Sequence, residues 1–147
     1  MNKILFLTAF SLMSLFGADF HTYEEALKIQ KKNHKIIMID VMRSDCHYCI
    51  KMDKKVFENE AMKKWLEDRF ILAKVNLDFD AVPLGQKVHF TPTFFFVNEK
   101  GKIVKKIPGS WNIQDFKDLT VNIKGTSKNP SISQREEKKD EIVKNLF

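Results

Sequence analysis

The sequence predicts an α/β fold in which a mixed central sheet carries helices on both faces. Strand and helix patterns follow a leading helix in the order β–α–β and then β–β–α. The last two strand patterns are separated by "NEKG" at 98–101, a turn that is typical of an antiparallel hairpin. The only two cysteines, Cys46 and Cys49, stand where a strand pattern passes into a helix pattern. A chain of 147 residues suits one domain of this kind.

The first half of the domain is predicted from capping and apolar patterns. Thr22 and Glu25 have the spacing of a capping box at the start of "YEEALKIQKKN". The next segment, "KIIMIDVM" at 35–42, is a short apolar run bounded by charge, and we interpret it as a buried strand. After the cysteines, "IKMDKKVF" has helical character, and Asn59 is placed to cap "EAMKKWLEDRF".

The second half contains the remaining strands and a closing helix. Apolar runs at 71–78, 93–97 and 102–107 predict three strands. The segment 81–88 between the first two reads as a loop with one helical turn. A Pro-Gly pair ends the last strand, and 112–123 is predicted to be the closing helix. We expect Trp111 and the Phe94–Phe96 run to belong to the core.

The chain begins with the pattern of a secretory signal. "MNK" supplies a basic start, and "ILFLTAFSLMSLF" is a mostly apolar run of thirteen residues followed by Gly17 and Ala18. A transmembrane helix needs about 20 such residues, so this run is too short to be an anchor. We expect residues 1–18 to be a signal peptide that is removed, although Phe16 is bulky for a position that favours a small residue. The predicted localisation is periplasmic or otherwise exported.

Two segments follow the signal. Residues 19–124 contain every predicted strand and both cysteines, and we expect them to form the domain. The segment 125–147 begins with the linker-like "GTSKNPSIS" and continues as a highly charged stretch that Ser133 and Glu136 are spaced to cap. We interpret it as a C-terminal extension whose apolar side consists of Ile142, Val143, Leu146 and Phe147.

The formal net charge of +6 does not identify a partner. The lysines are spread along the chain, and no nucleic-acid motif accompanies them. We interpret them as a solvated surface and expect no nucleic-acid partner. Weak attraction to anionic surfaces or acidic partners is the alternative.

The spacing Cys46-x-x-Cys49 is compatible with a redox pair, half of a metal site, a haem attachment point or a structural bridge. A bridge that closes so short a loop constrains the unfolded chain very little. Haem attachment requires His after the second cysteine, where Ile50 stands. Zinc needs about four ligands, there is no second cysteine pair, and the histidines are scattered at His21, His34, His47 and His89. We therefore interpret the pair as redox-active and expect no metal and no cofactor.

The predicted position of the pair gives the two cysteines different roles. Cys46 falls at a helix N-terminus, where free backbone N–H groups and the helix dipole stabilise a thiolate. Cys49 lies about one turn further into the helix and is placed to attack a mixed disulfide formed by Cys46. We expect His47 to tune the pair, because an imidazolium next to Cys46 favours its thiolate.

Beyond the cysteines, the chain resembles the thioredoxin superfamily over residues 22–124. Asp40 lies six residues before Cys46, on the preceding strand, as the buried acid of thioredoxins does. "AKVNLD" resembles the strand that brings a lysine near that acid, and the lysine corresponds to Lys74. The resemblance implies a thioredoxin fold and thiol–disulfide exchange. It also implies that Asp40 takes the proton from Cys49, with Lys74 tuning the acid or lying at the surface.

Two further segments carry the same resemblance. "FTPT" resembles the stretch whose proline follows a cis bond, which corresponds to Thr91 and Pro92. This implies an extended edge beside Cys46 that can pair with a substrate strand. Gly109 falls where the family has a glycine that flanks the substrate groove.

The surroundings of the cysteines depart from thioredoxins proper. Asp45 replaces the tryptophan before the first cysteine, and His47-Tyr48 replaces Gly-Pro between the two. The stretch "CHYCIKMDKKVFENEAMKKWL" is more similar to exported thioredoxins of the SoxW type and to the C-terminal domain of the DsbD reductase. Those proteins are mostly reductants, which implies a reductase here, with His47 and Tyr48 in groove or tuning positions.

The sequence thus predicts an exported protein-disulfide reductase in which Cys46 attacks and Cys49 resolves. Its partners would be protein disulfides and a membrane-bound or soluble thiol electron donor, and we expect a monomer. Two alternatives remain at this point: a thioredoxin-fold binding or chaperone module with an inert disulfide, and a small metal-binding protein.

Overall fold

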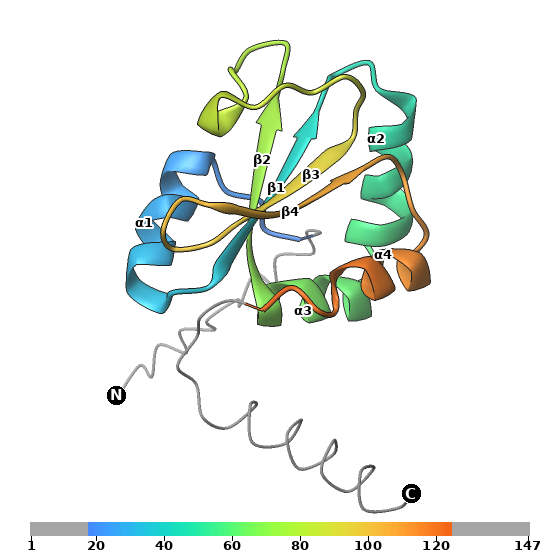
Figure 1. Cartoon of the computed structure of the whole chain (residues 1–147). Helices are drawn as coiled ribbons and strands as arrows, with labels where there is room; N and C mark the ends of the chain where they lie inside the picture. Colours follow the sequence, from blue (N-terminus) through green and yellow to red (C-terminus); the bar gives the residue numbers. More distant parts are fainter. Residues whose placement is uncertain (1–17, 125–147) are drawn as a thin grey trace, which may run out of the picture.

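A four-stranded mixed sheet with the order β2-β1-β3-β4 forms the centre of the domain (Figure 1). The computed structural model describes residues 18–124. Strand β1 (Ile36–Met42) pairs in parallel with β2 (Phe70–Asn76) and antiparallel with β3 (Thr93–Val97). Strand β4 (Ile103–Pro108) pairs antiparallel with β3 and forms the predicted hairpin. The predicted α/β class with a mixed sheet is confirmed.

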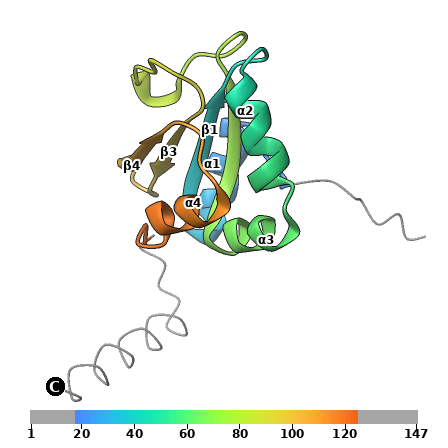
Figure 2. The ribbon, with the colours of Figure 1, turned by 90° about the vertical axis from the view of Figure 1, so that its right-hand side faces the viewer.

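Helices cover both faces of this sheet, as predicted. Helix α1 (Tyr23–Asn33) lies on one face. Helices α2 (His47–Met52), α3 (Glu60–Arg69) and α4 (Ile113–Thr120) lie on the other (Figures 1 and 2). We call the end of the sheet where β1 and β2 finish and β3 begins the active-site end, because the segment with Cys46 and Cys49 follows β1 there.

Alternating side chains divide the core into two layers. Ile36 and Met38 of β1 pack with α2, α3 and α4, whereas Ile37 and Ile39 pack on the side of α1. The Phe94–Phe96 run is fully buried and follows the same alternation, as its prediction as core requires. Asp40 takes the next position after Ile39, so the pleat turns its side chain toward the face that carries α2.

Helix starts agree with the capping signals in the sequence. The Thr22 hydroxyl accepts from the Glu25 N–H, and the Glu25 carboxylate accepts from the Thr22 N–H, which completes the capping box. The Asn59 side chain accepts from the Met62 N–H at the start of α3. These local hydrogen bonds explain why both boundaries could be predicted to the residue.

The helix after the cysteines and the closing helix differ from prediction. The first ends as α-helix at Met52 and continues as a π-helix over Asp53–Phe57, in which Val56 and Phe57 are both buried. The closing helix ends at Thr120, whose hydroxyl donates to the Phe116 carbonyl, and does not reach residue 123. The predicted helical turn between β2 and β3 is a short 3₁₀ turn at Pro83–Gly85.

A short N-terminal arm precedes α1 and extends the sheet. The His21 N–H donates to Leu72 O at 2.9 Å, and the Lys74 N–H donates to His21 O at 3.0 Å, so the arm runs along the outer edge of β2. Within residues 18–124 no helix has the length and hydropathy of a membrane span. Apart from Ala18, the predicted signal and the whole C-terminal extension, with its capping pair and apolar side, lie outside the described residues.

Candidate active site

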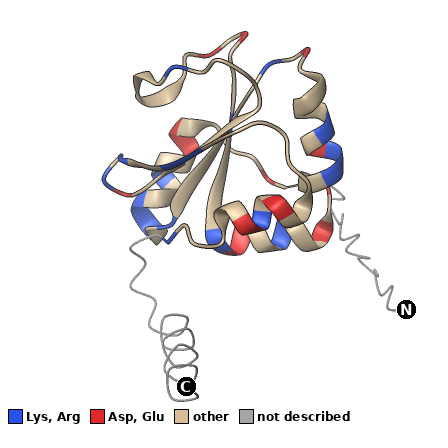
Figure 3. Ribbon diagram, turned by 45° about the vertical axis from the view of Figure 1, so that its right-hand side comes forward, with Lys and Arg blue, Asp and Glu red and all other residues tan. Residues whose placement is uncertain are grey.

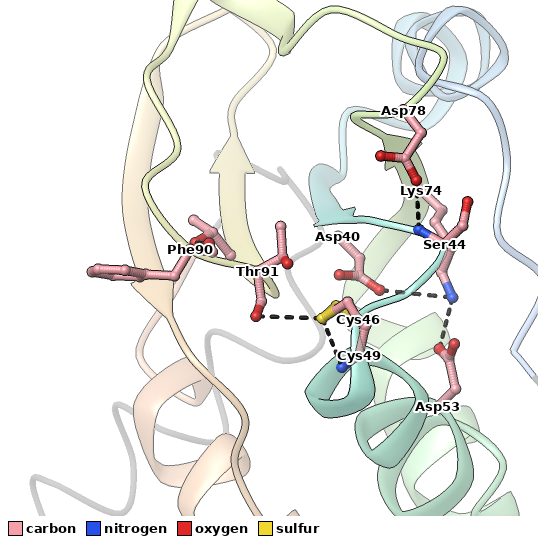
Figure 4. Close-up of a disulfide and its surroundings, with 10 residues drawn as sticks. Asp40, Ser44, Cys46, Cys49, Asp53, Lys74, Asp78, Phe90 and Thr91 are labelled. Carbon is pink, nitrogen blue, oxygen red and sulfur yellow. Dashed lines mark hydrogen bonds and ion pairs between the residues drawn. A yellow bond between two sulfur atoms is a disulfide. The ribbon is translucent and has the colours of Figure 1, made fainter.

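Cys46 and Cys49 form a disulfide at the active-site end of the sheet (Figure 4). Cys46 is the N-cap of α2, and its Sγ accepts a hydrogen bond from the Cys49 N–H at 3.1 Å. Cys46 is half-buried, whereas Cys49 is 2% exposed. A partner can therefore reach the first sulfur from solvent, and the second is covered. The helix start that stabilises a thiolate is present at the predicted place.

An acid at the end of β2 holds the loop that leads into the disulfide. The Asp78 carboxylate accepts from the Ser44 N–H at 2.8 Å and pairs with Arg43 Nη1 at 3.0 Å. Hydrogen bonds from Ser44, supported by the Arg43 charge, lower the pKa of Asp78. Asn76 also holds this loop, because its Nδ2 donates to the Ser44 hydroxyl at 2.8 Å. None of these residues was predicted as part of the site.

The segment before β3 lies against the disulfide from the other side. The Thr91–Pro92 bond is cis, as the family resemblance implied. The Thr91 carbonyl oxygen lies 3.4 Å from Cys46 Sγ (Figure 4). Gly109 joins this edge, because its N–H donates to Pro92 O at 2.8 Å. Its φ of 94° lies in the region that favours glycine. The structure thus brings Thr91 beside Cys46 and joins Pro92 to Gly109.

Asp40 lies beneath this end of the sheet, buried on β1. It is 2% exposed, and its Oδ1 has no hydrogen-bond partner among the described residues. Its Oδ2 is 3.7 Å from Lys74 Nζ of β2. Burial raises the pKa of Asp40 to about 7, against the opposing effect of the Lys74 ammonium and with an upward contribution from Asp53. A carboxyl group with this pKa can accept and release a proton near neutral pH.

Lys74 makes its shortest contact with a residue that the sequence reasoning missed. Its Nζ donates to Asp53 Oδ1 at 2.6 Å. Asp53 follows Cys49 by four residues, and this spacing places two side chains on the same side of a helix. That spacing is the signal that could have brought Asp53 into the predicted site. The alternative that Lys74 merely lies at the surface is wrong, since its side chain is only 27% exposed.

His47 and Tyr48 lie on the solvent side of the disulfide. Both are exposed, Tyr48 to 60%, and their rings meet edge to face with centroids 5.8 Å apart. Their groove or tuning roles stay predictions. Among residues 18–124 no three His, Cys, Asp or Glu side chains gather in a group that could hold a metal ion.

Residues 23–124 match the family described as a thioredoxin-like domain. The chain belongs to this family. A thioredoxin from Thermus thermophilus is 30% identical and superposes with a TM-score of 0.62, over 76% of this chain and 92% of that one. A putative disulphide-isomerase from Bacteroides thetaiotaomicron is 24% identical with a TM-score of 0.59, over 74% and 97% of the two chains. That second likeness shows the fold alone, which is the thioredoxin fold.

The curated relatives differ in how much of their own length matches this chain. Mouse Anterior gradient protein 3 is 26% identical over 110 residues, which cover 70% of this chain and 67% of that protein. An uncharacterised Caenorhabditis elegans protein is 45% identical over 53 residues, 36% of this chain but 7% of its own length. Mouse Spermatogenesis-associated protein 20 is 35% identical over 68 residues, 46% of this chain and 8% of its own length. The chain thus spans less than a tenth of two of these relatives.

A thioredoxin fold with a Cys-x-x-Cys disulfide at the end of its central strand points to thiol–disulfide oxidoreductase chemistry. The half-buried sulfur, the covered sulfur and the buried acid together provide the groups that such an exchange requires.

Proposed function

We propose that this protein is an exported thiol–disulfide oxidoreductase that reduces disulfides in other proteins through the Cys46–Cys49 pair. The observation that carries the proposal is the difference between the two sulfurs. Cys46 caps a helix at a half-buried position, and Cys49 is buried one turn further on. This arrangement suits a nucleophile followed by a resolving thiol.

The reaction has two steps. The Cys46 thiolate attacks one sulfur of a substrate disulfide, a bond joins Cys46 to the substrate, and the other substrate sulfur leaves as a thiolate that takes up a proton. Cys49 then gives its proton to Asp40 and attacks Cys46 Sγ. The Cys46–Cys49 disulfide forms, and the second substrate sulfur leaves and is protonated. Two electrons pass to the substrate, and a thiol donor must return them.

The proposed location and direction rest on the sequence. The apolar leader over residues 1–18 supports export. The resemblance of the cysteine segment to SoxW-type proteins and to the DsbD C-terminal domain supports reduction as the direction. The thiol donor is then either a membrane-bound or a soluble protein of the same compartment.

An insulin-reduction assay with dithiothreitol as donor tests the activity. The wild-type protein should accelerate precipitation of the insulin B chain, and Cys46→Ser should abolish the effect. Wild-type protein with no activity would favour a binding module with an inert disulfide. The reduction potential of the pair then tests the direction. A value near thioredoxin's, about −270 mV, supports a reductase, and a value near about −120 mV would make the protein an oxidant.

A further inference from the structure

The Lys74 ammonium is shared unequally between two carboxylates. Its Nζ lies 2.6 Å from Asp53 Oδ1, a short charge-assisted hydrogen bond, and 3.7 Å from Asp40 Oδ2, beyond hydrogen-bond distance. Figure 4 shows the ammonium drawn between the two acids, with Asp40 on the side of the disulfide. We propose that Asp53 is a positioning residue that holds Lys74 off Asp40 and thereby keeps Asp40 available as the proton acceptor for Cys49. The effect on proton transfer from Cys49 rests on the proposed function, whereas the contacts of Lys74 do not depend on it.

A second contact limits where the ammonium can go. The ring of Phe20, in the N-terminal arm, has its centroid 4.5 Å from Lys74 Nζ, within the range of a cation–π contact. Phe20 is itself fixed by edge-to-face packing on Phe57, with centroids 5.3 Å apart. One hydrogen bond and one ring therefore hold the ammonium, and Asp40 supplies neither.

The two acids differ in how far their side chains are exposed to solvent. The Asp53 side chain is 33% exposed and that of Asp40 only 3%. A partly hydrated carboxylate pairs with the cation, and the buried one is left with an Oδ1 that has no partner among the described residues. Burial favours the protonated form of the Asp40 carboxyl group, and an ammonium at 3.7 Å that makes no hydrogen bond to it offsets this effect only in part.

Among the groups around Asp40, Asp53 is the one whose substitution should change both the nearby charge and the position of Lys74. Strand β2 presents Lys74, and the helical segment after the disulfide presents Asp53. On β3 the residue opposite Asp40 in register is the apolar Phe94, and α2 contributes Cys49, which does not titrate while it is in the disulfide. Removing the charge of Asp53 removes a neighbouring anion and also frees Lys74 to approach Asp40. Both changes favour the Asp40 carboxylate and make it a weaker base.

The direct test is a carbon-13 NMR titration of the Asp40 carboxyl in the oxidised full chain. In Asp53→Asn the midpoint should fall by about one pH unit or more, as expected when a cation gains direct contact with a carboxylate. Asp53→Glu should restore a midpoint near that of the wild type. Asp68→Asn is the matched control, because Asp68 pairs with Lys64 at 3.3 Å on the exposed surface of α3. An unchanged or higher midpoint in Asp53→Asn would overturn the inference.

A kinetic readout separates positioning from a structural role. The rate at which Cys49 resolves a preformed mixed disulfide should depend on pH with a lower midpoint in Asp53→Asn than in the wild type. In an Asp40→Asn background, Asp53→Asn should have no further effect on that pH profile. If Asp53→Asn changed the profile there as much as it does in the wild type, the proposal would be contradicted. If the wild type reduces no protein disulfide, the proposed function fails, whereas the NMR midpoints still decide the role of Asp53.

Discussion

At the scale of single residues, the two cysteines differ in what surrounds them more than in their separation along the chain. Cys46 has the Thr91 carbonyl 3.4 Å from its sulfur and an open solvent side. Cys49 is covered and lies on the helix that also presents Asp53. The proposed order of attack and resolution rests on this asymmetry.

Serine substitutions should separate the two roles. Cys46→Ser should abolish disulfide exchange, because the accessible nucleophile is lost. Cys49→Ser should leave a protein that accumulates mixed disulfides with its partners, since nothing releases them. Non-reducing gels after incubation with a disulfide substrate measure both outcomes. Equal trapping of partners by the two variants would show that the roles are assigned wrongly.

The buried acid makes stability depend on pH. The pKa of Asp40 is raised from 3.8 to about 7 in the folded protein. The folded state therefore binds a proton more tightly than the unfolded state, and stability is lost as pH rises from about 4 through about 7. Asp40→Asn removes this dependence. The quantity to compare is the free energy of unfolding of the variant minus that of the wild type. This difference should be on the order of 2–4 kcal/mol larger above pH 7 than at pH 4.

Denaturant unfolding of both oxidised proteins at pH 4 and pH 8 measures this difference. The same substitution should slow resolution of the mixed disulfide, because it removes the proton acceptor. A stability difference that is equal at both pH values would show that Asp40 titrates in the folded state as it does in the unfolded chain.

At the scale of elements, the arm before α1 contributes packing as well as hydrogen bonds. Phe20 packs on Phe57 of the π-helix and covers the Lys74 ammonium. The arm also satisfies backbone groups on the outer edge of β2, at Leu72 and Lys74. The arm before the first helix is therefore part of the folded domain.

Shortening this side chain should destabilise the fold. Phe20→Ala should lower the free energy of unfolding by roughly 1–3 kcal/mol, less than for a fully buried phenylalanine because Phe20 is partly exposed. Phe79→Ala is the matched control, since Phe79 is 82% exposed and its loss should change stability by less than about 0.5 kcal/mol. Urea unfolding at one pH compares the two variants. Equal stability of both would mean that the arm does not hold the core.

At the scale of the whole molecule, charge and sheet edges bear on association. Lys and Arg lie on α1, on the turn between β3 and β4, and on the helices of the opposite face, with acidic residues between them (Figure 3). Strand β4 is one edge of the sheet, and its residues Lys105 and Lys106 are exposed next to a register irregularity in its pairing with β3. Charged side chains and irregular pairing are the usual protection of an edge strand.

We therefore expect the protein to be monomeric. Light scattering coupled to size exclusion should give the mass of one chain over a wide concentration range. Lys105→Val should increase association at high concentration, because it removes a charge from the exposed edge next to Val104, which is 43% exposed. A stable wild-type dimer would contradict the expectation.

Local signals made most of the fold predictable. The capping box at Thr22, the Asn59 cap and the strand "TFFFV" at 93–97 were predicted to the residue, because neighbouring residues supply the capping hydrogen bonds and the apolar run that define them. The position of Cys46 at a helix start followed from the same local patterns. The disulfide partners were predictable too, since the sequence contains no other cysteine that could compete for either sulfur.

The surroundings of that pair could not be predicted, because they consist of contacts between distant segments of the chain. Asp53 and Lys74 are 21 residues apart, and Ser44 and Asp78 are 34 apart. Neither contact has a periodic signature, because each depends on how β2 lies against β1 and on the turn of the helix after the disulfide. Phe20 reaches Lys74 only because the arm pairs with the edge of β2. The cysteines of the proposed exchange could be found from the sequence, whereas the charges and burial around Asp40 come from the packing of distant segments, since both depend on distance in space.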